Sequence, residues 1–151
     1  MRVTKFNHAC LFIEKGNDRL VIDPGAYTEL PRELDNISLV VVTHEHGDHC
    51  DPDNLNKILE QSPEAKIYTT AEAGKILAEA NIPHETVSGS QTVGRSFKVK
   101  LKAVDHAVVY GSSPCKALTV GVGSFLYYAS DSYVSTRDKY TVVAAPTSGP
   151  W

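Results

Sequence analysis

A run of six residues, His44-Glu45-His46-Gly47-Asp48-His49, is the part of this sequence best suited to do chemistry. It places three imidazoles and the carboxylate of Asp48 within one short stretch of chain. Neutral imidazole nitrogens and carboxylate oxygens are the ligands of Zn²⁺ and of neighbouring divalent metals. Because this concentration of ligands exceeds what a single tetrahedral ion needs, the spacing predicts two adjacent metal ions.

The residues on either side of this run predict the elements that hold it in place. Residues 38–43 are apolar and β-branched, which is typical of a buried strand. Asp51 and Pro52 then read as an N-cap and the first residue of a helix. An apolar helical stripe follows: Leu55, Ile58 and Leu59. A solvated loop that happens to be rich in histidine is the alternative, but a strand, this motif and a capped helix in succession favour a strand-to-helix metal loop.

This H-x-H-x-D-H pattern resembles the signature of the metallo-β-lactamase-fold hydrolase superfamily, here His44, His46, Asp48 and His49. The resemblance covers the whole chain. Residues 1–23 are similar to the family's opening β-hairpin, which ends in an Asp-Pro turn. Asn7-His8-Ala9 is similar to the Gly-His-Ala element of a lactonase and phosphodiesterase-like branch, with asparagine in place of the glycine.

The resemblance implies two further metal ligands. His106 follows an alternating strand where the family places its next ligand, and Asp131 occupies the position of the bridging aspartate. A structural histidine and a turn-forming aspartate are the alternatives. The implied ligand sets are, for the first ion, His44, His46 and His106, and for the second ion, Asp48, His49 and Asp131, with Asp131 touching both.

Two more residues are expected next to the metals. Asp23 resembles the family's outer aspartate, which orients a ligand histidine, although an Asp-Pro-Gly turn would also explain it. His8 is interpreted as an outer partner or a substrate contact, with a partly buried hydrogen-bonded histidine as the alternative. A loop containing Tyr110, Ser112 and Ser113 is a further candidate for pocket lining.

The order of the remaining elements predicts an α/β protein, α+β in some schemes. Strands are expected at residues 3–7, 9–14, 19–23, 66–69, 97–103, 116–122, 124–129 and 140–144. A helix is expected at residues 71–79, with Thr69 and Glu72 forming a capping box. The resemblance implies an αββα metallo-β-lactamase sandwich, and we expect residues 1–151 to be a single domain whose C-terminal part, including a final ligand histidine, is missing.

Composition limits the class of protein. With 42% hydrophobic and 22% charged residues the chain is typical of a globular domain. No apolar run approaches the ~20 residues needed to span a bilayer, and the N-terminus lacks the features of a signal peptide. Three cysteines without C-x-x-C spacing fit a reducing, cytoplasmic compartment. A net charge of −3 disfavours a nucleic-acid partner.

The sequence therefore predicts a metal-dependent hydrolase, with Zn²⁺ at two sites and Mn²⁺ as an alternative. A metal-activated water would attack an ester, a lactone or a phosphodiester in a small-molecule substrate, and Asp48 would orient or deprotonate that water. His46 favours hydrolysis over the family's di-iron redox branch, which carries glutamate there. The alternatives are a catalytically weak metal-binding or interaction module that lacks the last ligand, and a nuclease-like member of the fold. Uncovered strands at 124–129 and 140–144 predict a homo-oligomer.

Overall fold

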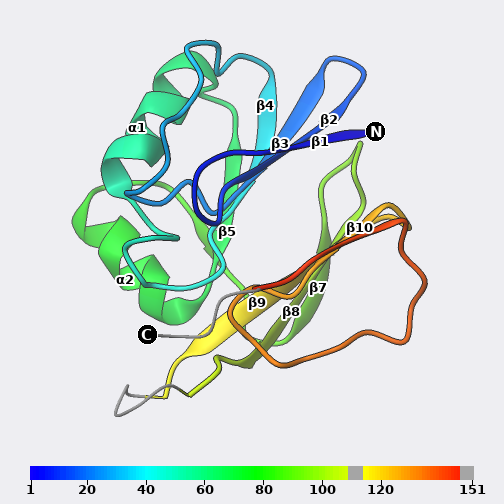
Figure 1. The fold of residues 1–151 in the computed structure, drawn as a ribbon. Coiled ribbons are helices and arrows are strands. Elements are labelled where there is room, and N and C mark those ends of the chain that lie inside the picture. Colours follow the sequence, from blue (N-terminus) through cyan, green and yellow to red (C-terminus); the bar gives the residue numbers. More distant parts are fainter. Residues whose placement is uncertain (109–113, 147–151) are drawn as a thin grey trace. The chain divides into compact units, whose positions relative to one another are not determined.

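A computed structural model describes residues 1–108 and 114–146 of the chain (Figure 1). The expected pocket-lining residues Tyr110, Ser112 and Ser113 lie outside these ranges, as do residues 147–151. The contacts of the chain divide it into two compact units, Met1–Thr86 and Val87–Trp151, which are described separately below.

The first unit is built on a six-stranded sheet whose strands follow one another in chain order. The first three strands pair antiparallel, and each later strand pairs parallel with the one before it. The strands are β1 (Arg2–Lys5), β2 (Leu11–Lys15), β3 (Asp18–Ile22), β4 (Ile37–Val41), β5 (Lys66–Thr69) and β6 (Glu85–Thr86). Strands β1 and β2 are shorter at their shared turn than expected, because His8 has a left-handed backbone there (φ 57°).

Two helices connect the parallel strands and lie on one face of this sheet (Figure 1). Helix α1 (Pro52–Gln61) joins β4 to β5, and its predicted start is confirmed, since the Asp51 side chain accepts a hydrogen bond from the Asn54 N–H. Helix α2 (Ala71–Glu79) joins β5 to β6 and has the predicted bounds. Parallel strands need such crossovers, so the helices fix the direction in which β4 delivers the chain to the histidine motif.

The predicted capping box of α2 is wrong by one residue. Thr70, not Thr69, is the N-cap, and its side chain accepts from the Ala73 N–H. Thr69 is the last residue of β5, and its hydroxyl donates to the carbonyl of Val42 at 2.8 Å. The Thr69 hydroxyl therefore bonds to the backbone after β4 instead of capping the helix as the sequence pattern predicts.

The core of the first unit lies between its helices and its sheet. Val21 and Val40 from the sheet and Leu55, Ile58 and Leu77 from the helices are fully buried in one cluster. Burying a side chain of this size contributes about 1.5–3 kcal/mol, so this cluster holds the helices on the sheet and keeps the loop after β4 in one place.

The second unit contains a five-stranded sheet with the order β11-β10-β9-β8-β7. Its strands are β7 (Ser90–Val93), β8 (Val99–Asp105), β9 (Lys116–Val122), β10 (Leu126–Tyr128) and β11 (Val142–Ala144). Neighbouring strands are antiparallel except for β10 and β11. The predicted alternation is confirmed, because Val99 and Leu101 are buried while Lys100 and Lys102 are exposed.

Strands β6 and β7 were not expected from the sequence. Strand β6 has two exposed residues, and β7 buries only Val93 among polar neighbours. Neither carries an apolar pattern strong enough to predict a strand. Both are defined by their backbone pairing, β6 with β5 and β7 with β8. The predicted mixture of strands and helices, with two sheets, is nevertheless confirmed.

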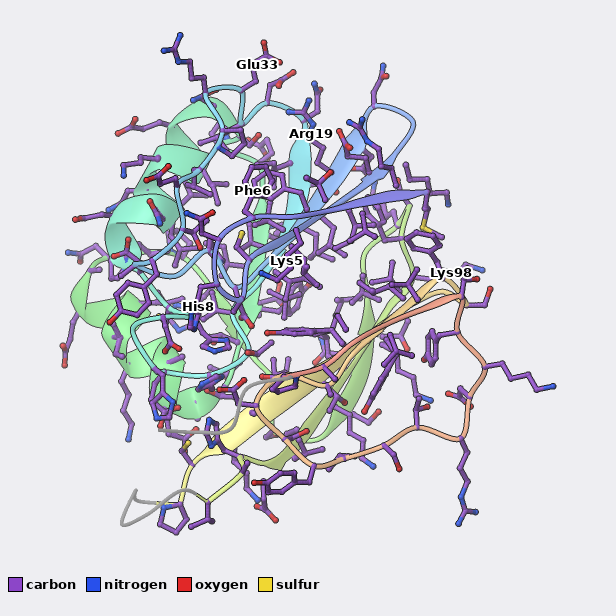
Figure 2. All side chains as sticks on the ribbon, viewed as in Figure 1. Lys5, Phe6, His8, Arg19, Glu33 and Lys98 are labelled. Atoms are coloured by element: carbon purple, nitrogen blue, oxygen red, sulfur yellow. The ribbon has the colours of Figure 1, made fainter. Side chains whose placement is uncertain are left out.

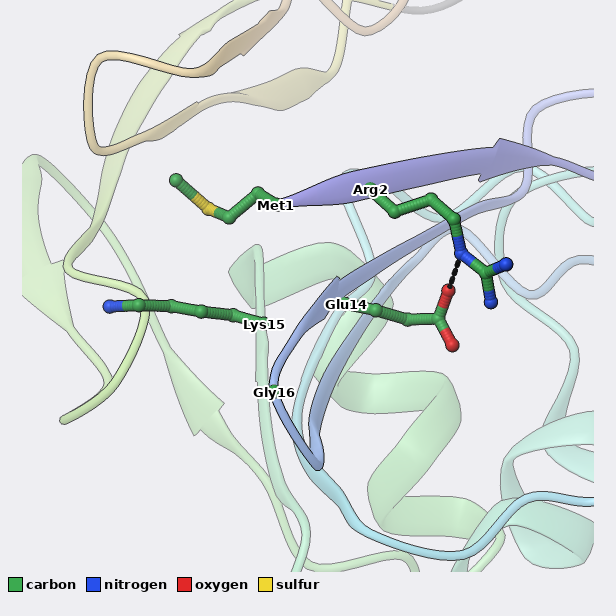
Figure 3. A pocket seen from close by; sticks show the side chains of 5 residues that line it. All are labelled: Met1, Arg2, Glu14, Lys15 and Gly16. Atoms are coloured by element: carbon green, nitrogen blue, oxygen red, sulfur yellow. Dashed lines mark hydrogen bonds and ion pairs between the residues drawn. The ribbon is translucent and has the colours of Figure 1, made fainter.

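Two surface properties bear on function. In residues 1–108 and 114–146 no helix has the length and apolar character needed to cross a membrane. An open surface depression of ≈ 380 Å³ lies at the ends of β1 and β2 away from their shared turn (Figure 3). It is lined by Met1, Arg2, Glu14, Lys15 and Gly16. None of these residues belongs to a group of candidate metal ligands in the described parts of the chain.

Candidate metal centre

The histidine motif forms the loop between β4 and α1. After β4 ends at Val41, the backbone N–H groups of His49 and Cys50 both donate to the carbonyl of His46, at 2.9 and 2.8 Å. These two bonds close a tight turn. The turn is fixed at one end by a buried strand and at the other by a capped helix, which is the arrangement that the flanking residues predict.

Asp23 holds the start of this loop in place by hydrogen bonds. It follows β3, has a left-handed backbone (φ 51°) and is fully buried. Its Oδ1 accepts from the Thr43 N–H at 2.7 Å, and its Oδ2 accepts from the Thr43 hydroxyl at 2.8 Å. A buried carboxylate is stable only when such donors satisfy its oxygens. The same hydrogen bonds hold Thr43, and with it the start of the loop, in place.

The same carboxylate sets the protonation pattern of His49. Nδ1 of His49 lies 2.8 Å from Asp23 Oδ2, and both side chains are almost completely buried. Since the carboxylate accepts, Nδ1 carries the hydrogen and Nε2 keeps its lone pair in the neutral ring. A carboxylate–histidine pair of this kind orients metal-binding imidazoles, which is the role expected of Asp23.

A relay through Thr43 does the same for His44. The single hydroxyl hydrogen of Thr43 goes to Asp23, so Thr43 Oγ1 can only accept from His44 Nδ1, which lies 3.1 Å away. Nε2 of His44 therefore holds a lone pair. The ring of His44 is fully buried, so this orientation is fixed by packing as well as by the hydrogen bond.

His44 and His46 present nitrogen atoms to the same point. His44 Nε2 and His46 Nδ1 are 3.1 Å apart, with the two rings nearly perpendicular at 80°. Two nitrogen ligands at ~2.0–2.1 Å from one tetrahedral Zn²⁺ would lie about 3.3 Å apart. The donor types and their separation therefore fit a shared divalent ion.

Asp48 lies on the other side of the turn. Its Oδ2 is 2.6 Å from Nε2 of His8 and 3.6 Å from Nε2 of His49. The donor atoms of these three residues, His8, Asp48 and His49, form a group that could hold a metal ion. Figure 2 labels His8, which lies in the turn between β1 and β2.

Two residues that the sequence interpretation did not assign to the site hold the loop against the β3 end. A Cβ at Gly25 would lie 1.9 Å from the carbonyl oxygen of Asp48, so only glycine permits this approach. Asn54, buried on α1, donates to the carbonyls of Gly25 and Thr28 at 3.0 and 3.3 Å. The glycine of Asp-Pro-Gly was read only as part of a turn; its contact partner, 23 positions along the chain, has no local signal.

Cys50 directly follows His49 but is not set up as a ligand. Burial raises the pKa of its thiol to about 12, and the carboxylates of Asp23, Asp51 and Glu45 add to this. A protonated thiol is a poor metal ligand, since metals bind the thiolate. Its 4% exposure is that of a small side chain packed in the core.

The second unit brings together His106 and Asp131. They follow β8 and β10, and His106 Nε2 lies 3.8 Å from Asp131 Oδ2. The Ala107 N–H donates to the Asp131 carbonyl at 2.8 Å, which ties the two strand ends together. Nδ1 of His106 lies 2.7 Å from the Ala107 carbonyl; it donates there, so Nε2 carries the lone pair.

The eight residues expected at the metal site thus fall into two groups. The first unit collects His8, Asp23, His44, His46, Asp48 and His49, and the second unit collects His106 and Asp131.

A comparison with protein families assigns the chain to a known family. Residues 2–119 match the family model described as the beta-lactamase superfamily domain, and the chain belongs to this family. The mixed α/β fold and the loop of histidines after β4 are the features that the sequence resemblance implied.

The relatives of the chain include proteins described as metal-dependent hydrolases. A protein of Mycobacterium tuberculosis is 28% identical over 158 residues, which cover 100% of this chain and 73% of that protein. A UPF0173 metal-dependent hydrolase of Saccharolobus solfataricus is 30% identical and matches 83% of this chain, which spans 59% of the relative's length. A solved structure of a putative metal-dependent hydrolase from Parabacteroides distasonis has a TM-score of 0.64 at 18% identity, covering 83% of this chain and 58% of that one, and shows the shared fold.

Proposed function

We propose that the protein is a metal-dependent hydrolase that uses a metal-activated water on an ester, lactone or phosphodiester bond of a small molecule. The observation that carries the proposal is the fixed protonation of the buried imidazoles. Asp23 and Thr43 occupy Nδ1 of His49 and of His44, so that both rings direct Nε2 lone pairs into the loop.

The proposed ligand sets are those that the family resemblance implies, and the contacts within each unit support them. His44 and His46 would hold one ion and Asp48 and His49 a second, with His106 joining the first set and Asp131 touching both. The nitrogen and oxygen donors suit Zn²⁺, with Mn²⁺ as an alternative. The pairing of His106 with Asp131 at 3.8 Å supports treating the two as one functional group.

The protein's own groups would perform distinct tasks. A bound divalent ion supplies Lewis acidity and lowers the pKa of a coordinated water to about 7. Asp48, a partly exposed carboxylate, would orient that water and take its proton. Asp23 would hold the ligand imidazoles in the right tautomer and orientation, because its oxygens accept from Thr43 and from His49 Nδ1.

The test combines metal content with turnover. Protein loaded with Zn²⁺ or Mn²⁺ would be assayed on p-nitrophenyl esters, lactones and bis(p-nitrophenyl) phosphate. We expect Asp48→Ala to lower kcat by about 10²–10⁴-fold, the usual contribution of a general base. Elemental analysis of His44→Ala/His46→Ala and of His106→Ala should show lost metal. His84→Gln is the matched control. His84 is not a proposed metal ligand, and its Nδ1 contacts the Ile82 carbonyl.

Two outcomes would overturn the proposal. Unchanged metal content in the double variant would remove the ligand assignment. Full metal content without turnover on any of these substrate classes would favour a metal-binding interaction module instead.

We further propose a cytoplasmic homo-oligomer without a nucleic-acid partner. Strand β11 is at the edge of its sheet among the described strands, and its Val143 side chain is exposed. Exposed edges of this kind pair with other chains. Light scattering coupled to size exclusion would test the oligomer, and a monomer at all concentrations would contradict it.

A further inference from the structure

The turn between β1 and β2 brings one more imidazole to the metal loop. We propose that His8 is a ligand of a divalent cation together with Asp48 and His49, three donors that all lie within residues 1–86. This rests on the proposed metal-dependent function but concerns a separate residue, which the implied ligand sets do not include.

Three donor atoms converge there. Asp48 Oδ2 lies 2.6 Å from His8 Nε2 and 3.6 Å from His49 Nε2. The rings of His8 and His49 are perpendicular, with centroids 6.0 Å apart. One carboxylate oxygen and two imidazole nitrogens from three sides make a typical set for Zn²⁺ or Mn²⁺.

The His49 nitrogen in this set is the one that carries the lone pair of the ring. Its other nitrogen is 2.8 Å from the buried carboxylate of Asp23, which leaves Nε2 as the lone-pair atom facing Asp48. The site therefore has the outer carboxylate that metal-binding histidines need. Because Asp23 also binds the Thr43 backbone, His49 cannot easily turn away.

His8 is held in place by its backbone. The Phe6 N–H donates to the Cys10 carbonyl at 2.9 Å across the turn, and the Lys5 ammonium donates to the carbonyls of Phe6 and His8. The left-handed conformation falls on His8 (φ 57°) and not on Asn7, which explains why glycine is not required at position 7. Such strained positions are typical of functional sites.

The side chain of His8 retains room to adjust. Ligands of one zinc ion lie about 3.3 Å apart, so His8 Nε2 and Asp48 Oδ2 must separate by about 0.7 Å from their present hydrogen-bond distance of 2.6 Å. The His8 side chain is 33% exposed, and its ring meets the exposed ring of Tyr27 edge-on. Movement of this size needs no change in the buried part of the loop.

The competing explanation is that His8 only donates a hydrogen bond to Asp48. Two substitutions separate the two roles. His8→Gln keeps an N–H donor of similar reach but loses the imidazole, and His8→Asn suits the left-handed backbone but is too short to reach. Tyr27→Phe is the matched control, because it keeps the ring beside His8 and removes no donor from the site.

The experiment is a titration of the full chain, freed of metal, with Co²⁺ and with Zn²⁺ in a metal buffer, followed by calorimetry and by the Co²⁺ absorption bands. We expect one equivalent to bind more than about 100-fold more weakly in both His8 variants, beyond the 10–100-fold effect of outer partners, with altered Co²⁺ bands. The equivalent held by His44 and His46, and both equivalents in Tyr27→Phe, should keep their affinities.

The outcomes distinguish this inference from the proposed function. Wild-type affinity and bands in His8→Gln, with weakening only in His8→Asn, would overturn the ligand role in favour of a hydrogen bond. Normal binding in both variants would overturn any role for His8 while leaving the metal-dependent function intact. Absence of metal binding in the wild type would overturn both.

Discussion

The two units of the chain hold their candidate residues in different ways. In the first, Asp23, His44 and His49 are buried, and hydrogen bonds from Asp23, directly to His49 and through Thr43 to His44, set which imidazole nitrogen carries the lone pair. In the second, His106 and Asp131 lie near strand ends; the His106 side chain is 8% exposed, and the Asp131 side chain is 36% exposed. The candidate groups of the first unit are therefore part of a buried hydrogen-bond network that stabilises the fold. Those of the second unit are held mainly by contacts within their own turns.

This contrast predicts that substitutions around the first group cost both stability and metal affinity, and that those in the second group affect chiefly metal affinity. The following changes are ordered by their expected effect on the free energy of unfolding.

Gly25→Ala should have the largest effect. Its Cβ would lie 1.9 Å from the Asp48 carbonyl, a backbone atom, so the metal loop must move as a whole. We expect a loss of about 3 kcal/mol or more and loss of bound metal. Urea unfolding measures the first, and elemental analysis the second. Gly47→Ala in the same loop is the control, since its Cβ would meet nothing within 4 Å; equal effects of the two changes would contradict the explanation.

Asp23→Asn should follow. The amide cannot accept from all three donors of Thr43 and His49, and its own N–H₂ would face them in a buried site. We expect a loss of about 2–4 kcal/mol and weaker metal binding by roughly 10–100-fold. Asp131→Asn is the matched change in the second unit, and it should lower stability by less than about 1 kcal/mol. Similar unfolding energies for the two variants would break the comparison between the units.

Thr43→Val tests the relay alone. Valine keeps the shape of the side chain but removes the hydroxyl that donates to Asp23 and accepts from His44 Nδ1. The expected loss is about 1–2 kcal/mol. NMR of the imidazole nitrogens should show His44 no longer held in a single tautomer. A single unchanged tautomer would mean that packing, and not Thr43, orients the ring.

Lys100→Ala should have the smallest effect. Its ammonium lies 3.4 Å from Asp138, but both side chains are more than half exposed. We expect a change within about 0.5 kcal/mol, measured by thermal unfolding, because exposed ion pairs contribute little. A larger loss would show that the exposed face of β8 makes a stabilising contact that the alternating pattern of apolar and lysine residues does not predict.

The local elements around the site were readable from the sequence because their causes are local. The apolar run before His44 predicts the buried strand, and Asp51 with Pro52 predicts the start of α1. The bounds of α2, β5 and β9 follow from amphipathic or apolar runs of their own. Where a local pattern had two readings, as at Thr69, strand pairing decided between them.

The sequence by itself determined the donor types, their spacing in one loop, and the strand and helix that flank them. Tertiary structure decided which nitrogen of His44 and of His49 carries the lone pair, since that depends on Asp23, a residue about 20 positions away from Thr43 in the chain. The parallel register of β3 and β4, with Ile22 opposite Val41, brings Asp23 to Thr43. Sheet register in turn also sets the approach of Gly25 to Asp48, and the β1–β2 turn sets that of His8. Contacts between distant residues depend on how elements pack, which no local pattern records.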